Sequence, residues 1–262
     1  MRPIRMRRLS VLLLSLPGLA ACVTTSTAPP LAPARPDDAA QFNLELGISY
    51  LRDNKLQAAR EKLEKALTQN PSLVTAEWTL GVVFERLEDP KGAEHHYRRA
   101  VDLDGTDPGA LNALAVFTCN YRKEPREALK LFDRALAVPL SQKAANRPML
   151  NANAGTCAKQ VDPARAEKYL RNALVDDPQF ADALLQLASV TLEQGKALQA
   201  RGFLERYMAQ APATPATLLL GVRIEQALND TEAADRYADR LRNEFPSSVE
   251  AGQLAGKAAP RS

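Results

Sequence analysis

The feature that most constrains this chain is a recurrence of small side chains at intervals of 34 or 35 residues, with one longer interval of 38 or 39 in each series. One series consists of Ala59, Ala93, Ala128, Ala166, Ala200 and Ala234. A second series precedes it, with Gly47, Gly81, Ala115, Ala154, Ala188 and Val222. Periodicity of this length indicates one supersecondary unit that is repeated and stacked on its neighbours.

The residues between these positions indicate that each unit is a helical hairpin. Helix-ending residues fall near the end of five units, at Pro71, Gly105, Pro178, Pro212 and Pro246. The pairs Asp107-Pro108 and Asp162-Pro163 place an N-cap acceptor before a first-turn proline. Aromatic residues make up only 5% of the chain, although 45% of it is hydrophobic. This composition suits closely packed helices better than sheets.

These patterns resemble the tetratricopeptide repeat (TPR) in six copies. The predicted copies are residues 40–73, 74–107, 108–146, 147–180, 181–214 and 215–248, followed by a C-terminal tail at 249–262. We therefore predict an all-α TPR superhelical solenoid of six helix-turn-helix repeats. A TPR hairpin cannot bury its apolar face alone, so stacking creates the core. The resemblance implies that the first helix of each repeat lines a groove that binds other polypeptides.

The N-terminus has the three parts of an export signal. A basic stretch ends at Arg8, and a short apolar run follows from Leu9 to Leu16. The quartet Leu19-Ala20-Ala21-Cys22 completes the pattern. The apolar run is shorter than a membrane-spanning helix requires. Residues 1–21 are therefore predicted to be a cleaved signal peptide.

The quartet that ends at Cys22 resembles the bacterial lipobox. This resemblance implies a diacylglycerol and an N-acyl chain on Cys22, and several chains together anchor a protein stably. Val23 stands where many inner-membrane lipoproteins carry Asp, so the resemblance implies the periplasmic face of the outer membrane. Residues 22–39 are rich in proline and read as a tether. A plain signal peptide with an incidental cysteine is the alternative.

The charge distribution argues against nucleic acid as a partner. The chain has 34 basic and 31 acidic residues, and four of the arginines precede Cys22. Without these four, basic and acidic residues nearly balance, and no basic patch remains to neutralise phosphates.

We find no constellation of residues that predicts an enzyme. His95 and His96 are adjacent on one predicted helix, so they point in different directions, and we expect both to be solvated. No metal-binding motif or phosphate-binding glycine loop occurs. We predict no catalytic residue, no metal and no cofactor apart from the covalent lipid on Cys22.

Two further cysteines, Cys119 and Cys157, lie late in the first helices of repeats three and four. Successive first helices are neighbours in a TPR stack, and an exported protein meets an oxidising compartment. A disulfide between them is one interpretation, and two buried free thiols are the other.

The register of the repeats also predicts a partner-binding groove. Its expected residues are Leu44, Ile48, Leu51, Trp78, Val82 and Arg86, with Glu85 beside them. Repeats three and four offer Asn112, Asn120, Asn151 and Lys159. An apolar stripe with an aromatic anchor suits a peptide or helix partner. The alternative is that Leu44, Ile48 and Leu51 pack into the core.

Three stretches resemble the type IV pilus biogenesis/stability lipoproteins of the PilW/PilF type. They are AAQFNLELGISYLRDNKLQAAREKLEKAL, ALNALAVFTCNYRKEPREALKLFDRALAVP and LNANAGTCAKQ. The family's bridged cysteines in repeats three and four match Cys119 and Cys157. A longer aromatic-containing turn is usual where this chain has residues 122–125. The resemblance implies a monomeric pilotin that binds the pilus secretin subunit and promotes its outer-membrane localisation and multimer assembly.

The alternative function is a TPR scaffold lipoprotein of another envelope machine. β-Barrel assembly, peptidoglycan hydrolase regulation and polysaccharide export are the candidates.

Overall fold

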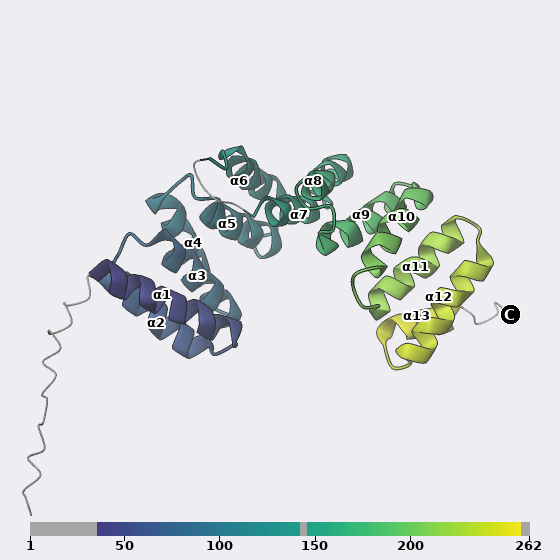
Figure 1. The fold of residues 1–262 in the computed structure, drawn as a ribbon, viewed down its shortest axis with the longest axis horizontal. Helices are drawn as coiled ribbons and strands as arrows, with labels where there is room; N and C mark the ends of the chain where they lie inside the picture. Colours follow the sequence, from purple (N-terminus) through teal and green to yellow (C-terminus); the bar gives the residue numbers. More distant parts are fainter. Residues whose placement is uncertain (1–35, 142–145, 258–262) are drawn as a thin grey trace, which may run out of the picture. The chain divides into compact units, whose positions relative to one another are not determined.

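The structure, a computed structural model, describes residues 36–141 and 146–257. Every regular element in these two ranges is an α-helix (Figure 1). The helices are α1 (Pro36–Arg52), α2 (Leu56–Gln69), α3 (Val74–Arg86), α4 (Pro90–Leu103), α5 (Pro108–Asn120), α6 (Pro125–Ala137), α7 (Arg147–Ala158), α8 (Pro163–Asp176), α9 (Ala181–Glu193), α10 (Ala197–Met208), α11 (Pro215–Ala227), α12 (Thr231–Glu244) and α13 (Val249–Lys257). The predicted all-α class is confirmed. The predicted signal peptide, Cys22 and residues 23–35 lie outside the described residues.

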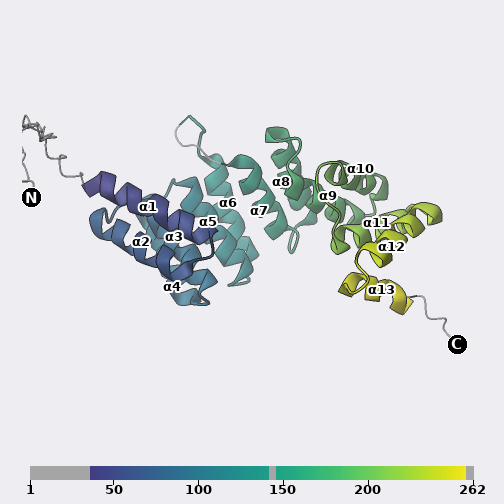
Figure 2. The same ribbon diagram turned by 60° about the horizontal axis from the view of Figure 1, so that its bottom comes forward.

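Helices α1 to α12 pack as six consecutive pairs, and Figures 1 and 2 show the pairs following one another along the chain. The first helices of repeats two to six begin at the residues predicted from the spacing: Val74, Pro108, Arg147, Ala181 and Pro215. Each first helix also contacts the first helix of the next pair, as in α3 with α5 and α5 with α7. Consecutive first helices therefore lie side by side.

Small residues lie where the two helices of a pair cross, as the sequence predicts. A Cβ built on Gly81 would lie 2.6 Å from the ring of Tyr97, and one on Gly47 would lie 2.7 Å from Leu63 Cγ. Carbon atoms in contact are normally about 3.5–4.0 Å apart, so neither position has room for a side chain. The alanine series is buried throughout: Ala59, Ala93, Ala128, Ala166 and Ala200 are 0% exposed and Ala234 is 5% exposed.

In repeats four and six a glycine beside the predicted residue also makes a close approach. Ala154 is 0% exposed and lies in one core cluster with Ala166, as predicted, and Gly155 next to it packs against the second helix. A Cβ on Gly155 would lie 2.6 Å from Leu170 Cγ. In repeat six a Cβ on Gly221, the residue before Val222, would lie 2.7 Å from the ring of Tyr237.

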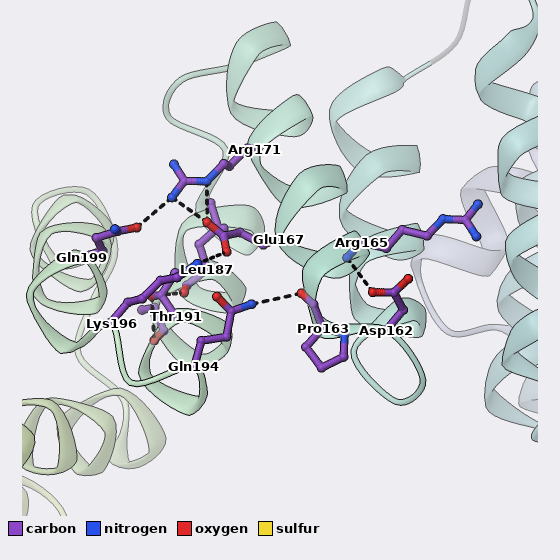
Figure 3. Close-up of polar contacts among 11 residues, drawn as sticks. Asp162, Pro163, Arg165, Glu167, Arg171, Leu187, Thr191, Gln194, Lys196 and Gln199 are labelled. Atoms are coloured by element: carbon purple, nitrogen blue, oxygen red, sulfur yellow. Dashed lines mark hydrogen bonds and ion pairs between the residues drawn. The ribbon is translucent and has the colours of Figure 1, made fainter.

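Local side-chain chemistry fixes several helix starts. Asp107 accepts a hydrogen bond from the Ala110 N–H at 2.8 Å. Asp162 accepts one from the Arg165 N–H at 2.9 Å, which Figure 3 shows. Both aspartates precede a proline in the first turn of their helix. Each cap satisfies a backbone donor that the helix itself cannot pair, and the two predicted N-caps are confirmed.

Polar contacts join repeats four and five (Figure 3). Glu167 on α8 bonds to Lys196 Nζ at 2.7 Å and to Arg171 Nε at 2.8 Å. The hydrogen bond from Lys196 holds the pKa of Glu167 below its ordinary value. Gln194 Nε2 donates to the carbonyl of Pro163 at 3.1 Å. These bonds tie the start of α8 to the turn between α9 and α10.

Helix α1 begins earlier than the sequence analysis expects. The tether was predicted to run to residue 39, but α1 starts at Pro36. Proline is well placed at the first position of a helix, and the carboxylates of Asp37 and Asp38 interact favourably with the helix N-terminus. These three residues therefore belong to the first repeat.

The predicted C-terminal tail is also partly wrong, because residues 249–257 form α13. This helix packs against α11 and α12. Ala251, which is 8% exposed, joins a cluster with Leu218, Leu219 and Leu241. A solenoid exposes the apolar face of its last repeat unless a further element covers it, and α13 does so here.

Candidate functional site

The residues predicted to line the N-terminal part of the groove divide between core and surface. Leu44 and Leu51 are 3% and 9% exposed and belong to a core cluster with Leu63 and Leu80. Ile48 is partly buried and packs against the same cluster. The expectation that Leu44 and Leu51 face a partner is therefore wrong. They lie seven residues apart on the face of α1 that packs toward α2 and α3.

The other three predicted residues, Trp78, Val82 and Arg86, line one pocket. It lies across the first helices α3, α5 and α7 and has a volume of about 610 Å³. Its walls are mostly apolar. The complete lining is Trp78, Val82, Glu85, Arg86, Tyr97, Gly109, Asn112, Ala113, Val116, Met149 and Asn153.

Trp78, the only tryptophan in the sequence, packs against the start of α5. A Cβ on Gly109 would lie 3.2 Å from Trp78 Nε1, so a glycine at this position lets the indole ring lie close to the helix. Among residues 36–141 and 146–257 the indole N–H has no hydrogen-bond partner. Trp78 is partly exposed and so presents both an apolar ring and an available donor to the pocket.

Two charged residues at the rim are held in place by bonds to the protein. The buried Tyr97 hydroxyl donates to Glu85 Oε2 at 2.8 Å. Burial, with the adjacent Glu85 carboxylate, raises the pKa of Tyr97 far above its ordinary value, so this donor keeps its proton. Arg86 Nη1 donates to the carbonyl of Leu51 at 3.0 Å, at the end of α1. Both bonds limit the movement of the pocket rim.

A pair of carboxamides connects the two helices on the other side of the pocket. Asn153 Nδ2 on α7 lies 3.0 Å from Asn112 Oδ1 on α5. Sequence analysis named Asn112 but missed Asn153 and named Asn151 instead. Asn151 is 2% exposed and donates to the carbonyl of Arg147 within α7. The register that places Asn112 four residues after the start of α5 gives Asn151 on α7, two residues before the observed Asn153.

The remaining residues predicted for the groove lie outside this pocket. Asn120 is exposed at the end of α5. Lys159 Nζ lies 2.9 Å from Ser189 Oγ and 2.7 Å from Glu193 Oε1 on α9. Met149, which sequence analysis missed, is 40% exposed and lines the pocket from α7.

Cys119 and Cys157 form a disulfide in the structure, with their Cα atoms 6.0 Å apart. Their side chains are buried, at 1% and 2% exposed. The bridge joins α5 to α7, the same two helices that the Asn112–Asn153 bond connects. Two of the three helices that form the pocket are therefore linked covalently.

The two histidines differ from each other. His95 is exposed, but the expectation that His96 is also solvated is wrong. His96 Nδ1 lies 2.8 Å from Glu77 Oε2, and its ring stacks on Phe84 with the centroids 5.0 Å apart. His96 on α4 thus contacts two side chains of α3, and these contacts give it a structural role.

Metal-binding clusters and membrane-spanning helices are two further features that an envelope protein can carry. No group of three or more His, Cys, Asp or Glu residues in the described ranges is arranged to hold a metal ion. None of the helices from α1 to α13 has both the length and the apolar character that crossing a bilayer requires.

Comparison with protein families identifies the repeat. Residues 35–108 match one tetratricopeptide repeat model, and residues 158–220 match another. Cellulose synthase operon protein C of Xanthomonas axonopodis is 29% identical over 71% of this chain, which corresponds to 12% of that much longer protein.

Two pilus proteins match over nearly their whole length. The type IV pilus assembly protein PilF of Pseudomonas aeruginosa is 27% identical over 235 residues, which are 89% of this chain and 92% of PilF. The crystal structure of PilW, a widely conserved type IV pilus biogenesis factor, superimposes with a TM-score of 0.76 at 27% identity, covering 82% of this chain and 98% of PilW. A structure of Pseudomonas aeruginosa PilF has a TM-score of 0.75 at 26% identity, covering 85% and 99%.

Proposed function

Because this chain is a tetratricopeptide-repeat protein homologous to the type IV pilus biogenesis factors PilF and PilW, we propose that it is an outer-membrane pilotin. It binds the secretin subunit of the pilus machinery and promotes its localisation and assembly into multimers. The observation that carries the proposal is the length of the likeness, which spans 92% of PilF and 98% of PilW. Over that length the identity to each protein is 27%, and the TM-score to PilW is 0.76.

The pocket across α3, α5 and α7 supports a role in binding another polypeptide. Its apolar walls include an aromatic side chain, and its rim residues are fixed by bonds to Tyr97 and Leu51. Preorganised pockets with aromatic anchors contribute much of the affinity at protein interfaces. In this proposal the protein acts by binding and placing its partner.

The proposed lipid anchor on Cys22 would determine where the protein acts. Acyl chains on Cys22 would hold the repeats at the outer membrane, because two or more chains give a stable attachment. A secretin subunit bound to the repeats would then be kept beside the bilayer into which its ring inserts. Anchoring raises the local concentration of the subunit at that membrane.

Substitution of the proposed lipidation site tests this function. In the Cys22→Ser variant we expect the protein in the soluble periplasmic fraction, fewer secretin multimers in the outer membrane, and loss of twitching motility. Thr25→Ser, a conservative change in the same segment that keeps the cysteine, is the control and should behave as wild type. Normal secretin multimers with a soluble Cys22→Ser protein would contradict anchored delivery.

The likeness to cellulose synthase operon protein C supports a second candidate, a scaffold for polysaccharide export. Deletion of the gene separates the two. Loss of secretin multimers with normal polysaccharide supports the pilotin, and loss of polysaccharide with intact secretin multimers supports the scaffold.

A further inference from the structure

The pocket across α3, α5 and α7 contains hydrogen-bonding groups that its own structure leaves partly unused. Asn112 and Asn153 make one bond to each other, which uses one amide nitrogen and one carbonyl oxygen. The NH₂ group of Asn112 and the carbonyl oxygen of Asn153 have no partner in the described part of the chain. If both amides were flipped, the pair would still present one free NH₂ group and one free carbonyl oxygen.

This free pair matches the backbone of an extended peptide. A residue in an extended chain offers one N–H and one C=O, which are the complements of a carbonyl oxygen and an NH₂ group. A helix uses these groups in its own hydrogen bonds, so an apolar helix face would leave both asparagines unpaired. Leaving a buried polar group unpaired costs about 1–3 kcal/mol, and an acyl chain would incur the same penalty.

The apolar part of the pocket provides a place for a side chain. Trp78 on α3 and Met149 on α7 lie on the two sides of α5, and Val82 and Val116 line the wall between them. Met149 is 40% exposed although it is a large apolar residue. A volume of about 610 Å³ lies within the range of roughly 300–1,000 Å³ for pockets that enclose ligands. It can hold one large side chain together with its neighbouring backbone.

We propose that this pocket binds an extended segment of the secretin subunit. One large apolar side chain of the segment lies between Trp78 and Met149, and the adjoining peptide groups bond to Asn112 and Asn153. Because side chains of an extended chain alternate, the residues on either side of the anchor point away from the pocket. This inference rests on the proposed function, since it names the shape and chemistry of the partner that the pilotin binds.

Trp78 makes the test direct, because it is the only tryptophan in the chain and lies in the pocket. Periplasmic fragments of the secretin, with any tryptophan replaced by phenylalanine, are titrated into the purified protein. Calorimetry measures binding wherever it occurs, and Trp78 emission reports binding in the pocket. Met149→Asp should weaken binding at least tenfold by placing a charge in an apolar wall. Leu198→Asp, at a residue that is 70% exposed on α10, is the matched control and should change nothing.

The extended conformation is tested on the ligand, so that the protein fold is left untouched. The fragment that binds is shortened to a peptide and N-methylated at one backbone position at a time. We expect loss of binding by about tenfold at one position next to the anchor residue. Asn153→Leu should weaken binding by a similar factor. In that variant the same N-methyl group should weaken binding little further, because the bond that it removes is already absent.

The outcomes separate this inference from the proposed function. If calorimetry detects binding but Trp78 emission does not change and Met149→Asp has no effect, the pocket is not the binding site. The proposed pilotin function is then unaffected. Dependence on Met149 without any effect of N-methylation or Asn153→Leu overturns the extended segment and indicates a helix or an acyl chain. Absence of calorimetric binding by every fragment overturns both the pilotin and the pocket assignment.

Discussion

Reduction of the Cys119–Cys157 disulfide should destabilise the protein by an amount that follows from its place in the chain. The bridge closes a separation of 38 residues. In the chain-entropy model this restricts the unfolded chain enough to contribute about 4 kcal/mol. With a slope of about 2 kcal/mol per molar urea, the unfolding midpoint should fall by about 2 M.

The measurement compares one sequence in two redox states. A Cys22→Ser version of the exported chain is unfolded in urea with and without a phosphine reductant, and both circular dichroism and Trp78 fluorescence are recorded. The bridge joins repeats three and four, while Trp78 lies in repeat two. In a solenoid each repeat contacts only its neighbours, so without the bridge the repeats on its two sides should unfold in two separate transitions. Trp78 then reports the N-terminal side alone.

The control is the Cys119→Ser/Cys157→Ser variant, which should resemble the reduced protein and show no response to reductant. If reduction lowers the urea unfolding midpoint by less than about 0.5 M, the bridge contributes only about 1 kcal/mol to the free energy of unfolding at this slope, and the estimate is refuted. A response of the serine variant to reductant would show that the shift has another source.

Three further results are expected, two from the packing of helices and one from a buried tyrosine. Gly81→Ala should lower the free energy of unfolding by about 1–3 kcal/mol because its Cβ meets the Tyr97 ring at 2.6 Å. Gly202→Ala on α10, where no atom lies within 4 Å of the new Cβ, should raise it by about 0.5–1 kcal/mol, and urea unfolding measures both. Burial, with a hydrogen bond to Asp133, raises the pKa of Tyr169 to about 12, above the ordinary value of 10.0. The neutral hydroxyl therefore stabilises the fold below pH 10, and this contribution is lost as the pH rises to about 12, so Tyr169→Phe should flatten the stability profile there.

The repeat boundaries were predictable from the spacing, and local chemistry marks three of them, because α5, α7 and α11 each begin with a capping side chain and a proline, whereas α3 and α9 have neither. A proline such as Pro108 and an N-cap such as Asp107 act within one turn of a helix, and the five predicted first-helix starts agree with the structure. The crossing residues were predictable for a similar reason, since only a small side chain such as Gly81 fits against Tyr97. Ala154 is buried as predicted, but the close approaches of Gly155 and Gly221, each beside a predicted position, were missed.

The pocket was only partly predictable, because its residues come from three repeats. Trp78, Val82 and Arg86 lie on one helix and follow from its register. Asn153 and Met149 come from α7, where the position carried over from α5 gave Asn151 instead. Leu44 was misplaced for another reason. Periodicity identifies the apolar face of α1, but it does not say whether that face meets a partner or the next helices of the same chain.

The disulfide and the carboxamide pair act on the same helices at different points. Cys119 and Cys157 lie at the C-terminal ends of α5 and α7, while Asn112 and Asn153 lie nearer the middle. In a solenoid the spacing of adjacent repeats depends on their mutual contact alone. The covalent link therefore restricts that spacing before any partner arrives. Entropy that would otherwise be lost on binding is then removed during folding, so we expect the link to strengthen binding in the proposed pocket without touching the ligand.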